Sequence, residues 1–168
     1  MKLLLITSIL LTLFYQDLSA QTTSIPDAAF EQKLIQLGYD SDGIVNGQIL
    51  SSDAANIFFL DISGSYNNRG NIQDLSGIED FTNLSELNCD WNQITDLDCS
   101  LNSNLEQLLC SQNYITFLNT FGLNQLHTLD AASNQLTSID VSANLNLQNF
   151  FCSQNQLSSI DVTSNVNL

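Results

Sequence analysis

Basic residues are almost absent from this sequence. Its 168 residues include 3 Lys and Arg against 18 Asp and Glu, which gives a formal net charge of −15 at pH 7. Nucleic acids are bound by basic surfaces that neutralise phosphates, so this charge argues against a nucleic-acid-binding protein. It also argues against adsorption to anionic membranes. The acidity indicates solubility, with cationic or calcium-bridged partners as a secondary hypothesis.

Histidine and long apolar runs are also scarce. The single histidine is His127, and neither a Ser/His/Asp set nor a Cys-x₂-Cys pair accompanies it at a spacing that indicates catalysis or zinc binding. Asp130 could lie near it on the same strand, but we interpret His127 as a surface residue and predict no enzymatic activity. After residue 20, no run approaches the roughly 18 apolar residues of a membrane-spanning helix, so membrane insertion is not expected.

The first 20 residues have the features of a secretory signal peptide. Lys2 is the short basic region, residues 3–14 are apolar, and Leu18-Ser19-Ala20 is an acceptable cleavage site before Gln21. No cysteine follows that site, so a lipid anchor is not expected there. We therefore predict a secreted or cell-surface protein.

A unit of 21 residues repeats four times without insertions after residue 83. Position 1 of each unit is Leu, position 6 is Cys or Ala, position 9 is Asn, and positions 4, 11 and 14 are apolar. A short fixed period is typical of a solenoid, whose stacked turns bury a common core. The units are 84–104, 105–125, 126–146 and 147–167.

Each unit is predicted to contribute one short strand and one asparagine turn. Apolar positions 4 and 6 alternate with polar neighbours, so the strands should stack in parallel about 4.8 Å apart. The asparagines at position 9 should form a ladder by bonding backbone groups of their own and the next turn. The second half of each unit is too short for a helix and should form a thin convex side of extended or 3₁₀ segments.

Residues 21–56 are predicted to form an N-terminal helical cap, which a solenoid needs to cover its first turn. Within them, residues 25–38 read as a short helix that begins near Pro26 and stops at Gly38. Its apolar face is formed by Phe30, Leu34 and Leu37.

Two acidic segments raise the hypothesis of a calcium site. Residues 40–47 resemble a calcium-binding loop in composition. In an EF-hand alignment, however, the first and twelfth ligand positions would fall on Gly38 and Ile49, which carry no carboxylate, so we favour a polar turn. Position 15 of the repeat carries Asp98, Asn119, Asp140 and Asp161. Because Asn interrupts this row, we favour side chains that cap turns, and we predict no cofactor, with Ca²⁺ as the less favoured alternative.

Residues 57–83 are a divergent first repeat. Ile57, Leu60 and Ile62 match positions 1, 4 and 6, and residues 65–70 are inserted at the turn. We expect this insertion to protrude, and Arg69 could make it a contact site.

The four cysteines are interpreted as thiols that fill the core. Cys89, Cys110 and Cys152 share the inward position 6, and Cys99 is at the inward position 16. A bridge between Cys89 and Cys110 stays open as the less favoured alternative, since in-register side chains run parallel.

The repeat pattern L-x-x-L-x-[C/A]-x-x-N-x-[I/L] resembles the leucine-rich repeat, and residues 74–81 resemble the repeat of internalin-type surface proteins. Together with the segment I-P-D-A-A-F-E-Q-K-L-I-Q-L-G, the chain resembles secreted leucine-rich repeat proteins of Bacteroidetes, especially flavobacteria. The resemblance implies an α/β-type solenoid, mostly β, with a helical cap. Such proteins usually have more repeats, so we expect a truncated array whose open C-terminal end could self-associate.

The resemblance also implies an extracellular module that recognises a protein or glycan without catalysis. Outward strand positions are mostly small and polar, but a few large side chains there are not required for folding and are typical of interface anchors. Two alternatives are the targeting arm of a larger secreted enzyme and a structural spacer in a surface adhesin. The candidate partner-binding residues on the concave face are Glu86, Asn88, Asp90, Trp91, Leu109, Tyr114, Asp130 and Phe151.

Overall fold

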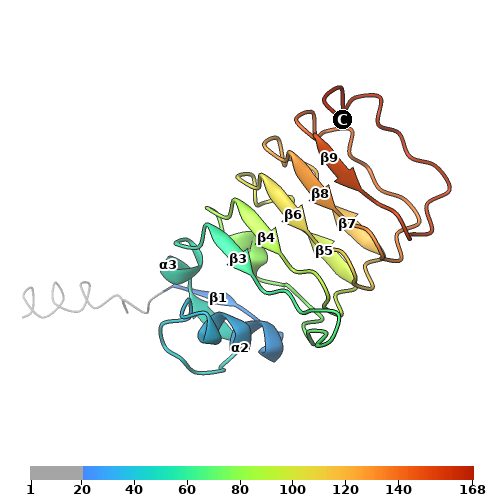
Figure 1. Ribbon diagram of the computed structural model, residues 1–168. Helices are drawn as coiled ribbons and strands as arrows, with labels where there is room; N and C mark the ends of the chain where they lie inside the picture. The colour runs from blue at the N-terminus through green and yellow to red at the C-terminus, as the bar shows by residue number, and fades with distance from the viewer. Residues whose placement is uncertain (1–20) are drawn as a thin grey trace, which may run out of the picture.

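The computed structural model describes residues 21–168, and the predicted signal peptide at residues 1–20 lies outside them. Five short strands stack side by side into one parallel sheet along the length of the coil (Figure 1). Each strand pairs in register with the same repeat positions of the next, as Leu87 does with Leu108 and Leu108 with Leu129. In spatial order the strands are β3 (Phe59–Asp61), β4 (Glu86–Asn88), β6 (Gln107–Leu109), β8 (Thr128–Asp130) and β9 (Asn149–Phe151).

The opposite limb of each turn is thin and extended, as predicted. It contains a second parallel pair, β5 (Asp96–Asp98) with β7 (Phe117–Asn119), and a 3₁₀ turn at Ile78–Asp80. These residues form no helix because the unit is too short to hold one beside its strand. The molecule is therefore a mostly-β solenoid.

The predicted asparagine ladder at position 9 is present, but its direction differs from the prediction. The side-chain amide of Asn113 donates to Cys110 O of its own turn (3.2 Å) and to Cys89 O of the preceding turn (2.9 Å). Its Oδ1 accepts from Ile94 N, also in the preceding turn (3.1 Å). The reach is backward because the carbonyl at position 6 of each turn faces the following one. The ladder satisfies backbone groups that would otherwise be buried and unpaired.

A second asparagine ladder, at position 19, escaped the sequence analysis. Asn102 donates to Ile78 O (2.8 Å), and Asn144 donates to Leu123 O (3.1 Å). Position 19 of unit 105–125 is Leu123 itself, and there Thr120 Oγ1 donates to Asn144 Oδ1 instead (2.9 Å). The sequence contained the evidence for this ladder, because position 19 is Asn in three of the four units and Leu123 is the single exception.

Position 15 caps turns, as favoured above. Each side chain accepts a hydrogen bond from the backbone N–H two residues later, for example Asp98 from Ser100 (2.9 Å) and Asn119 from Phe121 (3.1 Å). Hydrogen bonds from the side chains of Ser142 and Thr163, together with those from their backbone N–H groups, lower the pKa of the Asp140 and Asp161 carboxyls. Asn119 therefore interrupts the row of charge without interrupting its structural role.

The N-terminal segment contains helix α2 (Ala28–Gln36), the single turn α3 (Ser51–Ala54), and an antiparallel pair that the sequence did not reveal, β1 (Thr22–Ser24) with β2 (Gln48–Leu50). Asp27 begins α2 by accepting from Ala29 N and Phe30 N. Phe30 and Leu34 are buried in the same core as the repeats, and the Phe30 ring stacks on Phe81 at 6.0 Å. Leu37, predicted on this apolar face, is exposed because the helix has already ended there.

The loop at residues 40–47 is held by carboxylates that accept backbone hydrogen bonds. Glu31 is fully buried and accepts from the N–H groups of Asn46, Gly47 and Gln48. Asp42 accepts from Ile44 N (2.7 Å). Within residues 21–168, no group of three or more His, Cys, Asp or Glu side chains is placed to hold a metal ion.

All four cysteines are free thiols. Cys89, Cys99 and Cys110 are buried, and Cys152 is partly buried. Burial raises the pKa of the Cys99 thiol to about 12, so this group is an inert part of the core.

Candidate functional site

Five of the eight candidate residues lie on the outer face of the five-stranded sheet, at repeat positions 3 and 5. This sheet face is defined by the side chains of Phe59, Asp61, Glu86, Asn88, Gln107, Leu109, Thr128, Asp130, Asn149 and Phe151. Glu86 and Phe151 are exposed, while Asn88, Leu109 and Asp130 are half-buried. The structure therefore brings these five candidates onto one continuous surface.

The polar residues at position 5 have a structural role that the sequence analysis missed. Asp61, Asn88 and Asp130 each accept, through Oδ1, from the backbone N–H two residues later, at 3.0, 3.1 and 3.0 Å. They cap the turn that follows the strand. At the same position Leu109 and Phe151 cannot form this bond, and Phe151 is 54% exposed. Since the fold requires neither apolar side chain there, these two residues are the better candidates for contact with another molecule.

A shallow hollow of about 160 Å³ lies on the sheet face over β3, β4 and β6. Phe59 and Leu109 form its apolar part, and Asp61 and Glu86 supply carboxylates. Phe59 is 60% exposed and was not among the candidates, because it belongs to the divergent first repeat. Alignment of that repeat with position 3 of the regular units would have identified it.

The other three candidates, Asp90, Trp91 and Tyr114, lie in the turns that follow β4 and β6. Trp91 has a backbone φ of 59°, in the left-handed region, and the same position of the later turns repeats this conformation. This backbone conformation belongs to the repeat and is not a local strain at Trp91, since Gln112, Ser133 and Gln154 adopt it as well. The aromatic side chain is therefore held at the edge of the sheet face rather than on it.

The insertion at residues 65–70 folds back over this edge, although its sequence predicted a protruding loop. Arg69 Nη1 donates to Asn92 O and Gln112 O, both at 2.7 Å. Its guanidinium lies 5.6 Å from the ring centre of Trp91 and 5.3 Å from that of Tyr114. These two carbonyls and two ring faces hold the guanidinium, and so the end of the loop, against the turns that follow β4 and β6. We call Tyr66, Arg69, Trp91 and Tyr114 the aromatic edge.

The aromatic edge covers part of the surface predicted to be free. Tyr66 meets Trp91 edge to face, with ring centres 5.7 Å apart, while Tyr66 itself is 82% exposed. Trp91 is thus partly enclosed by Tyr66 and Arg69. Its most accessible aromatic neighbour is Tyr66, which the sequence analysis did not single out.

Asp90 lies between the sheet face and the aromatic edge. Its Oδ1 accepts from Ser111 N at 2.6 Å. Burial raises the pKa of the Asp90 carboxyl, the bonds from Ser111 oppose this shift, and the negative charges of Asp130 and Asp61 add to it. This region therefore has a negative potential that a cationic group would relieve.

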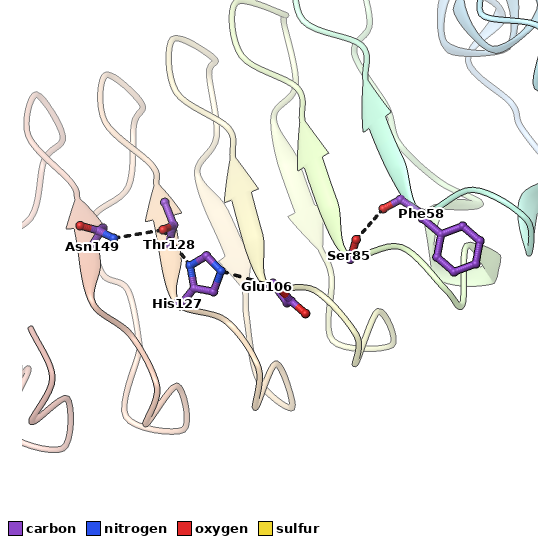
Figure 2. Close-up of polar contacts among 6 residues, drawn as sticks. All are labelled: Phe58, Ser85, Glu106, His127, Thr128 and Asn149. Carbon is purple, nitrogen blue, oxygen red and sulfur yellow. Dashed lines mark hydrogen bonds and ion pairs between the residues drawn. The ribbon is translucent and has the colours of Figure 1, made fainter.

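His127 lies at the start of β8, among polar contacts that run from strand to strand (Figure 2). Its Nε2 is 3.8 Å from Glu106, and its Nδ1 is 3.0 Å from Thr128 Oγ1, which accepts from Asn149 (3.2 Å). The ring contacts Glu106 and Thr128, whereas the sequence analysis considered Asp130 as its neighbour. The arrangement is a surface network between adjacent turns.

Among the helices of residues 21–168, none is both long and apolar enough to cross a membrane. No protein-family model matches the sequence, and no curated protein matches it.

Solved structures of two Listeria monocytogenes proteins resemble this one. The functional domain of InlJ, described as including a cysteine ladder, has a TM-score of 0.77 and 34% sequence identity over 89% of this chain. The internalin InlF has a TM-score of 0.58 and 22% identity, also over 89% of this chain. The match spans 32% of the InlJ chain and 50% of the InlF chain. The structural neighbours are therefore internalin-like leucine-rich repeat proteins, which agrees with the expected fold.

Proposed function

We propose that this chain is a recognition module that binds an extracellular protein through the sheet face and the aromatic edge. One observation carries the proposal: Leu109 and Phe151 replace turn-capping Asp or Asn at position 5 and add apolar groups to a mostly polar surface. Aromatic side chains such as Phe are enriched in protein interfaces, and the buried core of an interface is more apolar than the rest of the surface. The internalin-like neighbours support the same role.

The chemistry of the surface defines the partner class. Apolar groups are spaced along the sheet face, with Phe59 on the first strand β3, Leu109 on the central strand β6 and Phe151 on the last strand β9. The carboxylates of Asp61, Glu86 and Asp130 lie on β3, β4 and β8. A protein surface on which apolar and basic side chains alternate would complement this arrangement. Glycan recognition would instead depend on the exposed ring of Tyr66 and not on the carboxylates.

Three further parts of the proposal rest on the sequence. Residues 1–20 direct the chain out of the cytoplasm to the medium or the cell surface, and the module has no catalytic activity of its own. The segment with α2 serves as the N-terminal cap, which is supported by Phe30 and Leu34 packing into the core of the repeats.

The test is photo-crosslinking on cells and culture medium of the native host. A photoreactive phenylalanine analogue replaces exposed Glu86 on the sheet face or, as the control, exposed Ser159 on the opposite limb. We expect position 86 to give a protein adduct of defined mass that position 159 does not give. The double variant Leu109→Asn and Phe151→Asp, which restores the residues of other turns, should abolish the adduct without unfolding the chain.

No adduct from position 86, the same adduct from position 159, or an adduct that survives in the double variant would contradict the proposal. An adduct lost with Tyr66→Ala but retained in the double variant would place recognition at the aromatic edge alone.

A further inference from the structure

Unit 105–125 departs from the other units on the limb opposite the sheet face. Position 13 is Phe117 and position 17 is Phe121, which are 56% and 73% exposed. Every other regular turn has a small or charged polar residue at both positions: Asp96, Ser138 and Ser159 at the first, and Ser100, Ser142 and Thr163 at the second. Turns of the same geometry thus form without either phenylalanine.

Phe117 lies on β7, where it pairs in register with Asp96 of β5 (Figure 1). Two hollows flank its ring. One, of about 280 Å³, is lined by Phe117 and by the carboxylates of Asp74, Glu79, Asp96 and Asp98. The other, of about 210 Å³, is lined by Phe117 and Phe121 together with Ile139, Ala143 and Asp140. Polar residues such as Asn119 and Ser138 also line the second hollow, so an acidic hollow and a mixed hollow with two phenylalanine rings share Phe117 as a wall.

The acidic hollow holds its charge without a neighbouring cation. Asp74 and Asp98 each accept a backbone N–H two residues later, from Ser76 (2.8 Å) and Ser100 (2.9 Å). For Asp98, burial raises the pKa, but hydrogen bonds from Ser100 and Asn119 outweigh it and lower the pKa overall. No Lys, Arg or His among residues 21–168 lines either hollow. The site is thus complementary to a basic group beside an apolar one.

We propose that Phe117, Phe121 and the two hollows form a second docking surface, which takes a partner-protein segment carrying an aliphatic side chain next to lysine or arginine. The aliphatic group packs between Phe117 and Phe121, and the cation enters the hollow of Asp74, Glu79, Asp96 and Asp98. A second copy of this chain is a poor occupant, because it has 3 Lys and Arg against 18 Asp and Glu. The surface lies on the limb opposite the sheet face, so it goes beyond the function proposed above.

The test uses a synthetic peptide, acetyl-Gly-Leu-Lys-Leu-Lys-Gly-amide, and amide NMR of the whole chain. We expect saturable shifts of residues around the two hollows, such as the amides of Phe117, Asn119 and Asp140. Peptides with Glu in place of Lys, or Ser in place of Leu, should bind at least about tenfold more weakly.

The decisive variant is Phe117→Ser with Phe121→Ser, since Ser already occupies both positions in unit 126–146. It should weaken binding of the Leu-Lys peptide at least about tenfold, because truncation of an anchor residue commonly costs that much or more. The variant Leu109→Asn with Phe151→Asp changes only the sheet face and should bind the peptide as the unchanged chain does.

Three outcomes would overturn the proposal: no shifts, shifts on the sheet face without shifts around the hollows, or undiminished binding at the hollows by the Phe→Ser variant. Equal binding of the Glu peptide would also overturn it. If the double variant does not fold, Phe121→Ser alone decides, because its ring is the more exposed of the two. The variant Leu109→Asn with Phe151→Asp distinguishes the two proposals. If it still binds the peptide but no longer gives the crosslinked adduct, the second docking surface is independent of the sheet face.

Discussion

The interior of the coil and its outer surfaces use the repeat in different ways. Inside, position 9 is Asn in each unit from 84 to 167, and every copy bonds backbone groups of two turns. Outside, positions 5, 13 and 17 change from polar to large apolar residues between turns of the same geometry. A residue type that recurs in every turn therefore serves the hydrogen bonding of the backbone. A position where the residue type changes while the turn keeps its geometry is available for contact with other molecules.

The largest effect is expected inside. Asn113→Ala removes the amide that serves Cys89 O and Cys110 O and the oxygen that accepts from Ile94 N. Cys89 O and Cys110 O keep a second donor, from Asn92 and Asn134 respectively, whereas Ile94 N is left buried and unpaired. One unpaired buried group costs roughly 1–3 kcal/mol, and with the lost amide bonds we expect a loss of about 2–3 kcal/mol in the free energy of unfolding. Urea titration measures it. Asn149→Ala, on the exposed sheet face, is the control and should change it by less than about 0.5 kcal/mol.

A smaller effect is expected at the aromatic edge. Arg69→Ala removes two hydrogen bonds and two contacts with ring faces, which together contribute about 1–2 kcal/mol to the local order of residues 65–70. Amide hydrogen exchange should therefore accelerate in this insertion and not in unit 126–146. Fluorescence provides a second readout, since Trp91 is the single tryptophan and should become more exposed. Unchanged exchange and emission would show that the fold-back does not depend on Arg69.

The effect at Asp90 depends on pH. Its folded-state pKa is raised mainly by burial, so ionisation destabilises the fold as pH rises from the ordinary value of 3.8 through the folded pKa. Asp90→Asn, which retains an acceptor for Ser111 N, should therefore unfold at a higher urea concentration than the unchanged chain at pH 7. At pH 3 the two chains should unfold at similar urea concentrations. A stabilisation that is the same at both pH values would contradict this assignment.

The smallest effects are expected at the departures from the repeat. Leu109→Asn and Phe151→Asp restore residues used by other turns, as do Phe117→Ser and Phe121→Ser. Because most of these side chains are exposed, each change should alter the free energy of unfolding by less than about 0.5 kcal/mol. A loss above about 1 kcal/mol at any of them, measured by urea titration, would mean that the fold needs the residue and would remove it from the candidate contact surface.

Much of the fold follows from the sequence because its signals are periodic. A period of 21 residues predicts the coil, and alternation at positions 4 and 6 predicts the strands and the inward cysteines. The turn-capping role of Asp98 and Asn119 was predictable as well, because the bond is local. Five candidate residues came together on the sheet face for the same reason: equal positions of stacked turns must lie side by side.

Only the tertiary structure revealed the features that do not repeat and the contacts between residues far apart in the sequence. Arg69 belongs to an insertion without a counterpart in other turns, and its contacts with Trp91, Tyr114 and Gln112 depend on how the turns stack. The acidic hollow beside Phe117 joins residues of three turns, which no single unit reveals. The backward reach of the Asn113 amide depends on which way a strand carbonyl faces. Periodicity determines which residues share a face, whereas the contacts between turns depend on the direction of each backbone group and the path of the one insertion.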